Sequence, residues 1–216
     1  MSMHPRPVET GKLAENLYAV KTATVNLFLY KEGNNTICID SGFNNRVTVR
    51  QLKKLEINPE NVTHLFLTHS DFDHVNGLVI FKNAEIYISS EEEQMITRKK
   101  ARMFGIFFNK AIKRKINLLR DNDEISAGSI KVRALLTPGH TPGSMSYLLN
   151  DSILFGGDTF KVVNNKIYPL KRFYNMDTEL QKESIRRLAR LENIKLACTA
   201  HTGCTQSFDE AVREWK

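Results

Sequence analysis

The chain has 216 residues, of which 41% are hydrophobic, and a formal net charge of +7. This length and composition allow one sizeable hydrophobic core, so we expect a single domain spanning residues 1–216. No apolar run approaches the roughly 20 residues of a membrane span, and the opening MSMHPRPVETGK lacks the apolar stretch of a secretory signal, which predicts a cytoplasmic protein. Three cysteines, Cys38, Cys198 and Cys204, are an odd number for such a protein, so we predict thiols rather than a disulfide.

Strand and helix patterns alternate along the chain, which is typical of layered α/β architectures. Apolar and β-branched runs bounded by turn residues predict strands, and apolar residues at helical spacing predict helices. In chain order we predict strands at 17–30 and 36–40, a helix at 47–55, strands at 62–68, 85–89, 130–136, 146–149 and 152–155, a helix at 178–191 capped by Asp177 or Thr178, and a last strand at 195–200.

A basic segment at about 91–120 carries much of the positive charge. Its apolar residues recur at spacings compatible with helical packing: Ile96, Met103, Ile106, Phe107, Ala111, Ile112, Ile116 and Leu119. We therefore predict a basic helical insertion, whose apolar face shapes a pocket or a homodimer contact. The charge is interpreted first as a solvated face, with an anionic substrate, a lipid surface or a partner as the alternative. No nucleic-acid-binding motif accompanies it, so nucleic acid is not expected.

Eight acidic or histidine residues come at the ends of predicted strands or in the loops just after them. They are Asp40, His69, Asp71, Asp73, His74, His140, Asp158 and His201. In a sheet-based fold such strand ends can lie along one edge, where side chains distant in sequence can meet. Imidazole nitrogens and carboxylate oxygens are ligands that zinc, iron and manganese accept. The pattern therefore predicts a metal site that can hold two ions.

The order of these motifs resembles the metallo-β-lactamase superfamily. The likeness is carried by Asp40, the stretch HSDFDH at 69–74, TPGHTPGS at 137–144, GGDT at 156–159 and His201, and it extends over about residues 16–206. The motifs are similar to those of the hydrolase branch that includes glyoxalase II-like and lactonase-like proteins. This resemblance implies an α/β fold, an αββα sandwich of two mixed sheets flanked by helices, with a dinuclear site at one edge.

The resemblance also implies a role for each residue. His69, Asp71 and His140 are expected at the first metal, Asp73, His74 and His201 at the second, and Asp158 as the bridge between them. Asp40 is expected to support the site by hydrogen bonding from outside the ligand set. The basic segment at about 91–120 is expected beside this edge.

Asp71 departs from the pattern of the superfamily, in which histidine is common at this position. A carboxylate favours harder ions such as iron or manganese, and flavodiiron proteins of the same superfamily carry another carboxylate there. Asp71 is interpreted either as a direct ligand or as a hydrogen-bonding residue beside a one-metal or weakly occupied site. The cofactor expectation is two divalent ions, with zinc first and iron or manganese as alternatives.

Two divalent ions sharing a water lower its pKa toward neutrality, so a bridging hydroxide can attack a polarised carbonyl. We therefore predict a metal-dependent hydrolase acting on an ester, thioester or lactone, with Asp73 as the catalytic residue that relays a proton to the leaving group. The alternatives are an iron-dependent redox protein of the same fold and a metal-binding protein with little turnover. The substrate is expected to be a small molecule, and its candidate contacts are Tyr168, Lys171, Arg172 and Tyr174.

Overall fold

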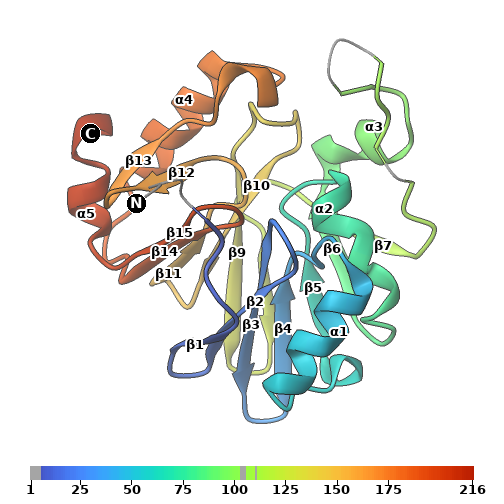
Figure 1. Ribbon diagram of the computed structural model, residues 1–216. Coiled ribbons are helices and arrows are strands. Elements are labelled where there is room, and N and C mark those ends of the chain that lie inside the picture. The colour runs from blue at the N-terminus through green and yellow to red at the C-terminus, as the bar shows by residue number, and fades with distance from the viewer. Residues whose placement is uncertain (1–5, 103–105, 110) are drawn as a thin grey trace.

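Two mixed β-sheets pack face to face with helices outside them, as the resemblance implied (Figure 1). The computed structural model describes residues 6–102, 106–109 and 111–216. Helices α1 and α2 lie on one side of the sandwich, and α4 and α5 lie on the other (Figure 1). Among the described residues, no helix combines the length and the apolar character needed to cross a membrane.

The first sheet contains the N-terminal strands in chain order. They are β1 (Gly11–Ala14), β2 (Leu17–Lys21), β3 (Asn26–Glu32), β4 (Asn35–Ile39), β5 (His64–Phe66), β6 (Glu85–Ser89) and β7 (Ile116–Leu119). Strands β1 to β4 pair antiparallel, whereas β4, β5, β6 and β7 are parallel neighbours. The parallel half brings the ends of β4 and β5 to one edge of the sheet.

The second sheet has the order β15, β14, β11, β10, β9, β8. Its strands are β8 (Glu124–Ala127), β9 (Ile130–Leu136), β10 (Met145–Leu149), β11 (Ile153–Phe155), β14 (Leu196–Thr199) and β15 (Gly203–Thr205). Strands β11 and β14 are parallel, and β9 runs in the same direction because two antiparallel pairings separate it from β11. The loops that follow these three strands therefore leave the sheet at one edge. A separate hairpin joins β12 (Lys161–Val163) and β13 (Lys166–Tyr168).

The helices are short apart from two. They are α1 (Asn45–Lys54), α2 (Phe72–Val75), α3 (Glu93–Ile96), α4 (Thr178–Leu188) and α5 (Phe208–Ala211). Asn44 caps α1 by accepting from the Val47 amide, and Asp177 caps α4 by accepting from the Leu180 amide, as predicted for that helix. These caps explain why both helices begin where the preceding loop ends.

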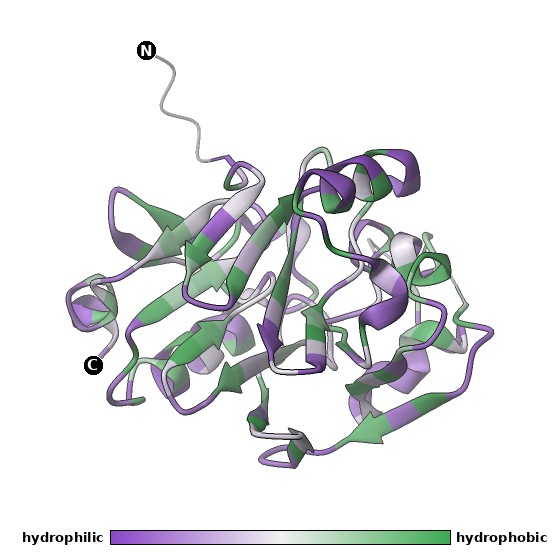
Figure 2. Cartoon of the chain, turned by 90° about the horizontal axis from the view of Figure 1, so that it is seen from below, coloured by the Kyte–Doolittle hydropathy of each residue, from purple (hydrophilic) through white to green (hydrophobic). Residues whose placement is uncertain are grey.

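Burial on both faces of each sheet produces three apolar layers. Phe28 points into the layer between the sheets with Phe66, Tyr147 and Phe155, while its neighbours Leu27 and Leu29 point the other way, toward α1. This alternation follows from the two-residue period of a strand. A third layer under α4 and α5 includes Leu148, Ile185 and Phe208. In Figure 2 hydrophobic segments gather along the strands, and the turns that join them are largely hydrophilic.

The predicted basic helix at about 91–120 is wrong. Among the described residues of this segment, only Glu93–Ile96 is α-helical, a backbone bridge joins Arg102 and Phe107, and Ile116–Leu119 forms strand β7. Ile106 and Phe107 are exposed, at 68% and 61%, so the helical spacing does not produce a buried face. Met103 lies outside the described residues. The apolar spacing predicted a helix wrongly because backbone N–H and C=O groups can also be satisfied by hydrogen bonds outside a helix. An irregular segment with such bonds does not need to be helical.

The prediction of three thiols is wrong for two of the cysteines. Cys198 in β14 and Cys204 in β15 form a disulfide, and Cys38 is a buried free thiol. The two strands are antiparallel and pair Cys198 directly with Cys204. Pairing across a tight turn cannot be read from the cysteine count, because it depends on a strand register that places the two residues opposite each other.

Candidate metal centre

The loops after four strands bring the predicted ligands together. His69 and the HSDFDH stretch follow β5, His140 follows β9, Asp158 follows β11 and His201 follows β14. Their donor atoms form three overlapping groups, each within 4.8 Å: His69 with Asp71 and His140, His69 with His74 and Asp158, and Asp73 with His74 and His201. We call the first group the first half of the centre and the last group the second half. Asp158 lies between them, 3.5 Å from His140 Nε2 and 3.4 Å from His201 Nε2.

Contacts between the two sheets hold these loops in place. The Tyr147 hydroxyl donates to the Leu67 carbonyl at 2.7 Å, and the Met145 amide donates to the Thr68 carbonyl at 2.8 Å. Gly157 has φ +51°, and a Cβ there would lie 2.6 Å from the Thr68 side chain. A residue with a side chain would therefore be strained and would push the Asp158 loop away from the His69 loop.

Two imidazoles of the second half are oriented by hydrogen bonds from outside. His74 Nδ1 lies 2.8 Å from Asp40 Oδ2, and His201 Nδ1 lies 2.8 Å from the Thr24 carbonyl oxygen. Asp40 is fixed in turn, because it accepts from the Thr68 amide at 2.8 Å. Each ring thus turns its Nε2 toward the carboxylates, with His74 Nε2 3.9 Å from Asp73 and 3.7 Å from Asp158. Partners of this kind fix ring orientation and raise the basicity of a metal-binding histidine.

The first half has a different environment. Asp71 Oδ2 lies 3.1 Å from His140 Nε2 and 3.6 Å from His69 Nε2, within the group expected for the first ion. The same oxygen accepts from Arg102 Nη2 at 2.8 Å, and Asp71 Oδ1 accepts from Asn109 Nδ2 at 3.0 Å. Arg102 and Asn109 are both 7% exposed. Both oxygens of Asp71 therefore accept hydrogen bonds, and its role as a direct ligand stays a prediction.

Sequence reasoning missed Arg102, Asn109 and a third residue of this surrounding, Glu92. The Glu92 side chain is fully buried and accepts from the Ser70 amide at 2.9 Å and from the Thr141 hydroxyl at 2.7 Å. It joins the loop of His69 to the loop of His140. The sequence offers no signal that separates Glu92 from its neighbours Glu91 and Glu93, or Arg102 from the other cations of the basic segment.

The carboxylates give the centre a strong preference for positive charge. Burial lowers the pKa of His74, but Asp40, Asp73 and Asp158 raise it to about 10. Burial likewise lowers the pKa of His201, and Asp158 and Asp73 raise it to about 9. Burial raises the pKa of the Asp158 carboxyl, yet His201, His74 and His140 hold it well below its ordinary value. A centre that retains protons this strongly also attracts a metal cation, which must displace them.

The residues fit a divalent transition metal. The Nε2 atoms of His69 and His74 are buried, point into the cluster and have no hydrogen-bond partner. An unpaired buried nitrogen costs free energy unless something binds it, and His74 Nε2 lies near Asp73 and Asp158 at distances that one ion can span. Imidazole and carboxylate together form a donor set that suits zinc, with iron and manganese also accommodated.

The four predicted substrate contacts are exposed, and the last of them, Tyr174, lies beside the first half. Tyr174 is 53% exposed and Tyr168 is 37% exposed, and Lys171 and Arg172 are exposed as well. The Tyr174 carbonyl accepts from Arg102 Nη2 at 3.0 Å, and the Met176 amide donates to the His140 carbonyl at 3.2 Å. These bonds place the 171–176 stretch against the centre. The structure contains no substrate, so the four contacts stay predictions.

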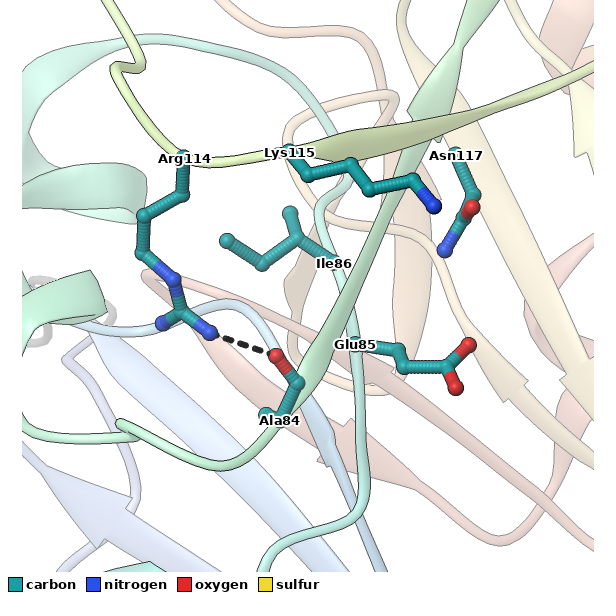
Figure 3. A pocket seen from close by; sticks show the side chains of 6 residues that line it. All are labelled: Ala84, Glu85, Ile86, Arg114, Lys115 and Asn117. Carbon is teal, nitrogen blue, oxygen red and sulfur yellow. Dashed lines mark hydrogen bonds between the residues drawn. The ribbon is translucent and has the colours of Figure 1, made fainter.

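A surface pocket in the same basic segment lies outside the centre. It has a volume of about 320 Å³ and is lined by Ala84, Glu85, Ile86, Arg114, Lys115 and Asn117 (Figure 3). Arg114 donates to the carbonyls of Phe81 at 2.7 Å and Ala84 at 2.6 Å. Its guanidinium therefore fixes the turn before β6, and none of the candidate metal ligands lines this pocket.

Comparison with known proteins gives one family and several relatives. The family model of the Metallo-beta-lactamase superfamily matches residues 21–201. A probable polyketide biosynthesis zinc-dependent hydrolase of Bacillus velezensis is 34% identical over 128 residues, which cover 58% of this chain and 49% of that protein. A hydroxyacylglutathione hydrolase of Buchnera aphidicola is 29% identical over 164 residues, covering 73% of this chain and 58% of that protein. The chain thus spans about half the length of these relatives.

A solved structure has the same fold. A metallo-beta-lactamase of Cronobacter sakazakii superposes with a TM-score of 0.72 at 20% sequence identity, covering 91% of this chain and 79% of that one. Likeness at this identity concerns the arrangement of sheets and helices. Chemistry has to be argued from the side chains of the centre.

Proposed function

Because the chain belongs to the metallo-beta-lactamase superfamily, we propose that it is a metal-dependent hydrolase of an ester, thioester or lactone. The observation that carries the proposal is the convergence of four imidazoles and three carboxylates, with two buried imidazole nitrogens that have no other partner. The names of the relatives, a zinc-dependent hydrolase and a hydroxyacylglutathione hydrolase, support zinc and hydrolysis. A bound divalent ion would supply an acidified water and polarise the substrate carbonyl.

Side chains and backbone groups of the protein provide proton transfer and the orientation of the ligands. Asp73 is partly exposed at 29% and lies 3.4 Å from His201 Nε2, so its carboxylate can take up a proton at the open side of the centre and return it to the leaving group. Asp40 and Thr24 keep the rings of His74 and His201 turned inward. Because the rings are already oriented, they do not have to reorient during the reaction step.

The surface around the centre supports a substrate with an apolar part. Phe72 is 48% exposed directly after Asp71, and Tyr174 is 53% exposed beside Arg102. Phe107 and Phe108, at 61% and 54% exposed, belong to the segment whose backbone is bonded to Arg102. Several large exposed apolar side chains at one edge are typical of a binding surface. We therefore infer an acyl group with an apolar chain rather than a short polar acid.

The iron-dependent redox alternative depended on Asp71 as a hard ligand. Both oxygens of Asp71 accept hydrogen bonds from Arg102 and Asn109, which weakens the support that Asp71 gives to a preference for iron. The imidazoles of the centre with Asp73 and Asp158 form a donor set that suits zinc, which supports hydrolysis.

A direct test compares chelated and zinc-restored protein on three substrate classes: a nitrophenyl ester, an acyl thioester and a lactone, each with a short and a longer acyl chain. We expect chelation to remove hydrolysis of at least one class and zinc to restore it, with the longer chain preferred. An Asp158→Asn variant serves as the matched control, because it keeps the shape of the side chain and loses its charge. Hydrolysis that survives both chelation and this substitution would contradict the proposal, as would the absence of turnover on all three classes.

A further inference from the structure

Arg102 contacts two candidate metal ligands of the first half. Its Nη2 is 2.8 Å from Asp71 Oδ2 and 3.2 Å from His140 Nε2. These two atoms belong to the group of three that could hold an ion there. The guanidinium thus contacts the atoms that a first ion would need.

Backbone contacts hold Arg102 in this position independently of Asp71. Its Nη1 donates to the His140 carbonyl, and its Nη2 also donates to the Tyr174 carbonyl at 3.0 Å. The backbone of Arg102 is itself bonded to Phe107, from the amide and from the carbonyl. The side chain is 9% exposed, so the guanidinium is largely removed from water.

Asn109 completes the arrangement around the carboxylate. It donates to Asp71 Oδ1 at 3.0 Å and to the Ser70 hydroxyl at 2.7 Å. The two oxygens of Asp71 therefore each accept from a buried donor of the 102–109 stretch. An ion that binds this carboxylate has to compete with two donors that already hold its oxygens.

A guanidinium at this place opposes an ion in two ways. It carries a positive charge, which repels a second cation within a few ångströms. It also presents N–H groups to the carboxylate oxygen and the imidazole nitrogen whose lone pairs a metal would use. Arg114 of the same segment shows the ordinary use of such a residue, since it donates to the carbonyls of Leu78, Phe81, Lys82 and Ala84.

We propose that Arg102 takes the place of an ion in the first half of the centre, so that the chain holds one divalent ion, among Asp73, His74, Asp158 and His201. The inference rests on the proposed function, because it needs a chain that binds metal. Arg102 is a positioning residue: it neutralises Asp71 and ties the loops of His140 and Tyr174 to the 102–109 stretch. Asp71 then acts as the anchor of Arg102 and not as a ligand.

The test is the number of zinc ions bound by folded protein after equilibrium dialysis, read by elemental analysis. We expect about one zinc per chain in the wild type and about two in Arg102→Ala, where Asp71 and His140 are released to bind an ion together with His69. In the Arg102→Ala variant the second equivalent should bind at least about tenfold more tightly than any second equivalent in the wild type. The double variant Arg102→Ala with Asp71→Asn should return to about one zinc, because the freed carboxylate is lost again.

Two more variants keep the test decisive. Lys100→Ala removes an exposed charge from the same segment and should bind zinc as the wild type does. Asp71→Asn alone should keep its single zinc, which matters if Arg102→Ala does not fold. Two zinc ions in the wild type, one zinc in folded Arg102→Ala, or loss of zinc in Asp71→Asn would each overturn the proposal while leaving the hydrolase in place. Absence of zinc from the wild type would overturn the proposed function and this inference with it.

Discussion

The two halves of the centre contain similar residue types in different surroundings. In the first half the Asp71 carboxylate accepts from Arg102 and Asn109, so protein donors already satisfy it. In the second half Asp73 lies 3.9 Å from His74 Nε2 and 3.4 Å from His201 Nε2, and the outer nitrogens of both rings are fixed by Asp40 and Thr24. A motif of metal-binding residue types therefore does not by itself tell how many ions a centre holds, because a cation from a distant segment can pair with one of its carboxylates.

The largest effect should follow from removing the imidazole at the core of the second half. His74→Ala takes away a fully buried donor that faces Asp73 and Asp158, so we expect loss of bound zinc and at least about a hundredfold loss of hydrolysis, beyond what an outer hydrogen-bonding partner costs. Elemental analysis and an ester assay measure both. His64→Ala, a half-buried imidazole outside the centre, is the matched control and should keep its zinc. Retained zinc in His74→Ala would erase the distinction between the halves.

A smaller effect should follow from weakening the hydrogen bond that orients the His74 imidazole. Asp40→Asn keeps the size of the side chain but removes the charge beside His74 Nδ1, and we expect about a 10- to 100-fold loss of zinc affinity. Competition with a chromophoric chelator gives the affinity. Unchanged affinity would mean that Asp40 only anchors the Thr68 backbone, to which it is also bonded.

Zinc binding should become tighter as pH rises, because protons compete with the ion in the second half. The pKa values of His74 and His201 are raised to about 10 and about 9, so both rings are protonated at neutral pH until zinc displaces the protons. Since these folded-state pKa values lie above the ordinary value, the stability that they contribute to the zinc-free chain is present below the unfolded pKa and is lost as pH rises through about 9 to about 10. Calorimetry in buffers of different ionisation enthalpy counts the released protons, and a heat that does not depend on the buffer would contradict the expectation.

The smallest effect should come from the exposed rim. Tyr174→Ala removes a 53% exposed ring while its backbone carbonyl can still accept from Arg102. We expect KM for a long-chain ester to rise about 2- to 10-fold, the scale of one aromatic contact, with little change in kcat. The acetyl ester is the internal control, because it lacks the chain that the ring would contact. An equal rise in KM for both esters would assign Tyr174 a structural role.

Strands with clear boundaries could be predicted from the sequence. Residues 85–89 and 130–136 are strands with the predicted bounds, because buried β-branched runs there end at turn residues. The predicted strand at 17–30 is two strands, β2 and β3, with Ala23 at φ +85° in the turn between them. The β12–β13 hairpin was missed although Asn164 and Asn165, both with positive φ, are a recognised hairpin signal.

The candidate ligands could be predicted and their surroundings could not. His69, His140, Asp158 and His201 could be predicted because each follows the end of a predicted strand, and such positions share an edge of a sheet. Arg102 gave no such signal, since its partners Asp71, His140 and Tyr174 lie 31, 38 and 72 residues away along the chain. Contacts at that separation depend on the tertiary fold, which local periodicity does not describe.

The most direct test of the difference between the halves is a crystal structure of zinc-loaded wild-type protein with anomalous diffraction at the zinc edge. We expect one anomalous peak, among Asp73, His74, Asp158 and His201, with the Arg102 guanidinium still hydrogen-bonded to Asp71. A second peak of comparable height between His69, Asp71 and His140, with Arg102 displaced, would contradict it.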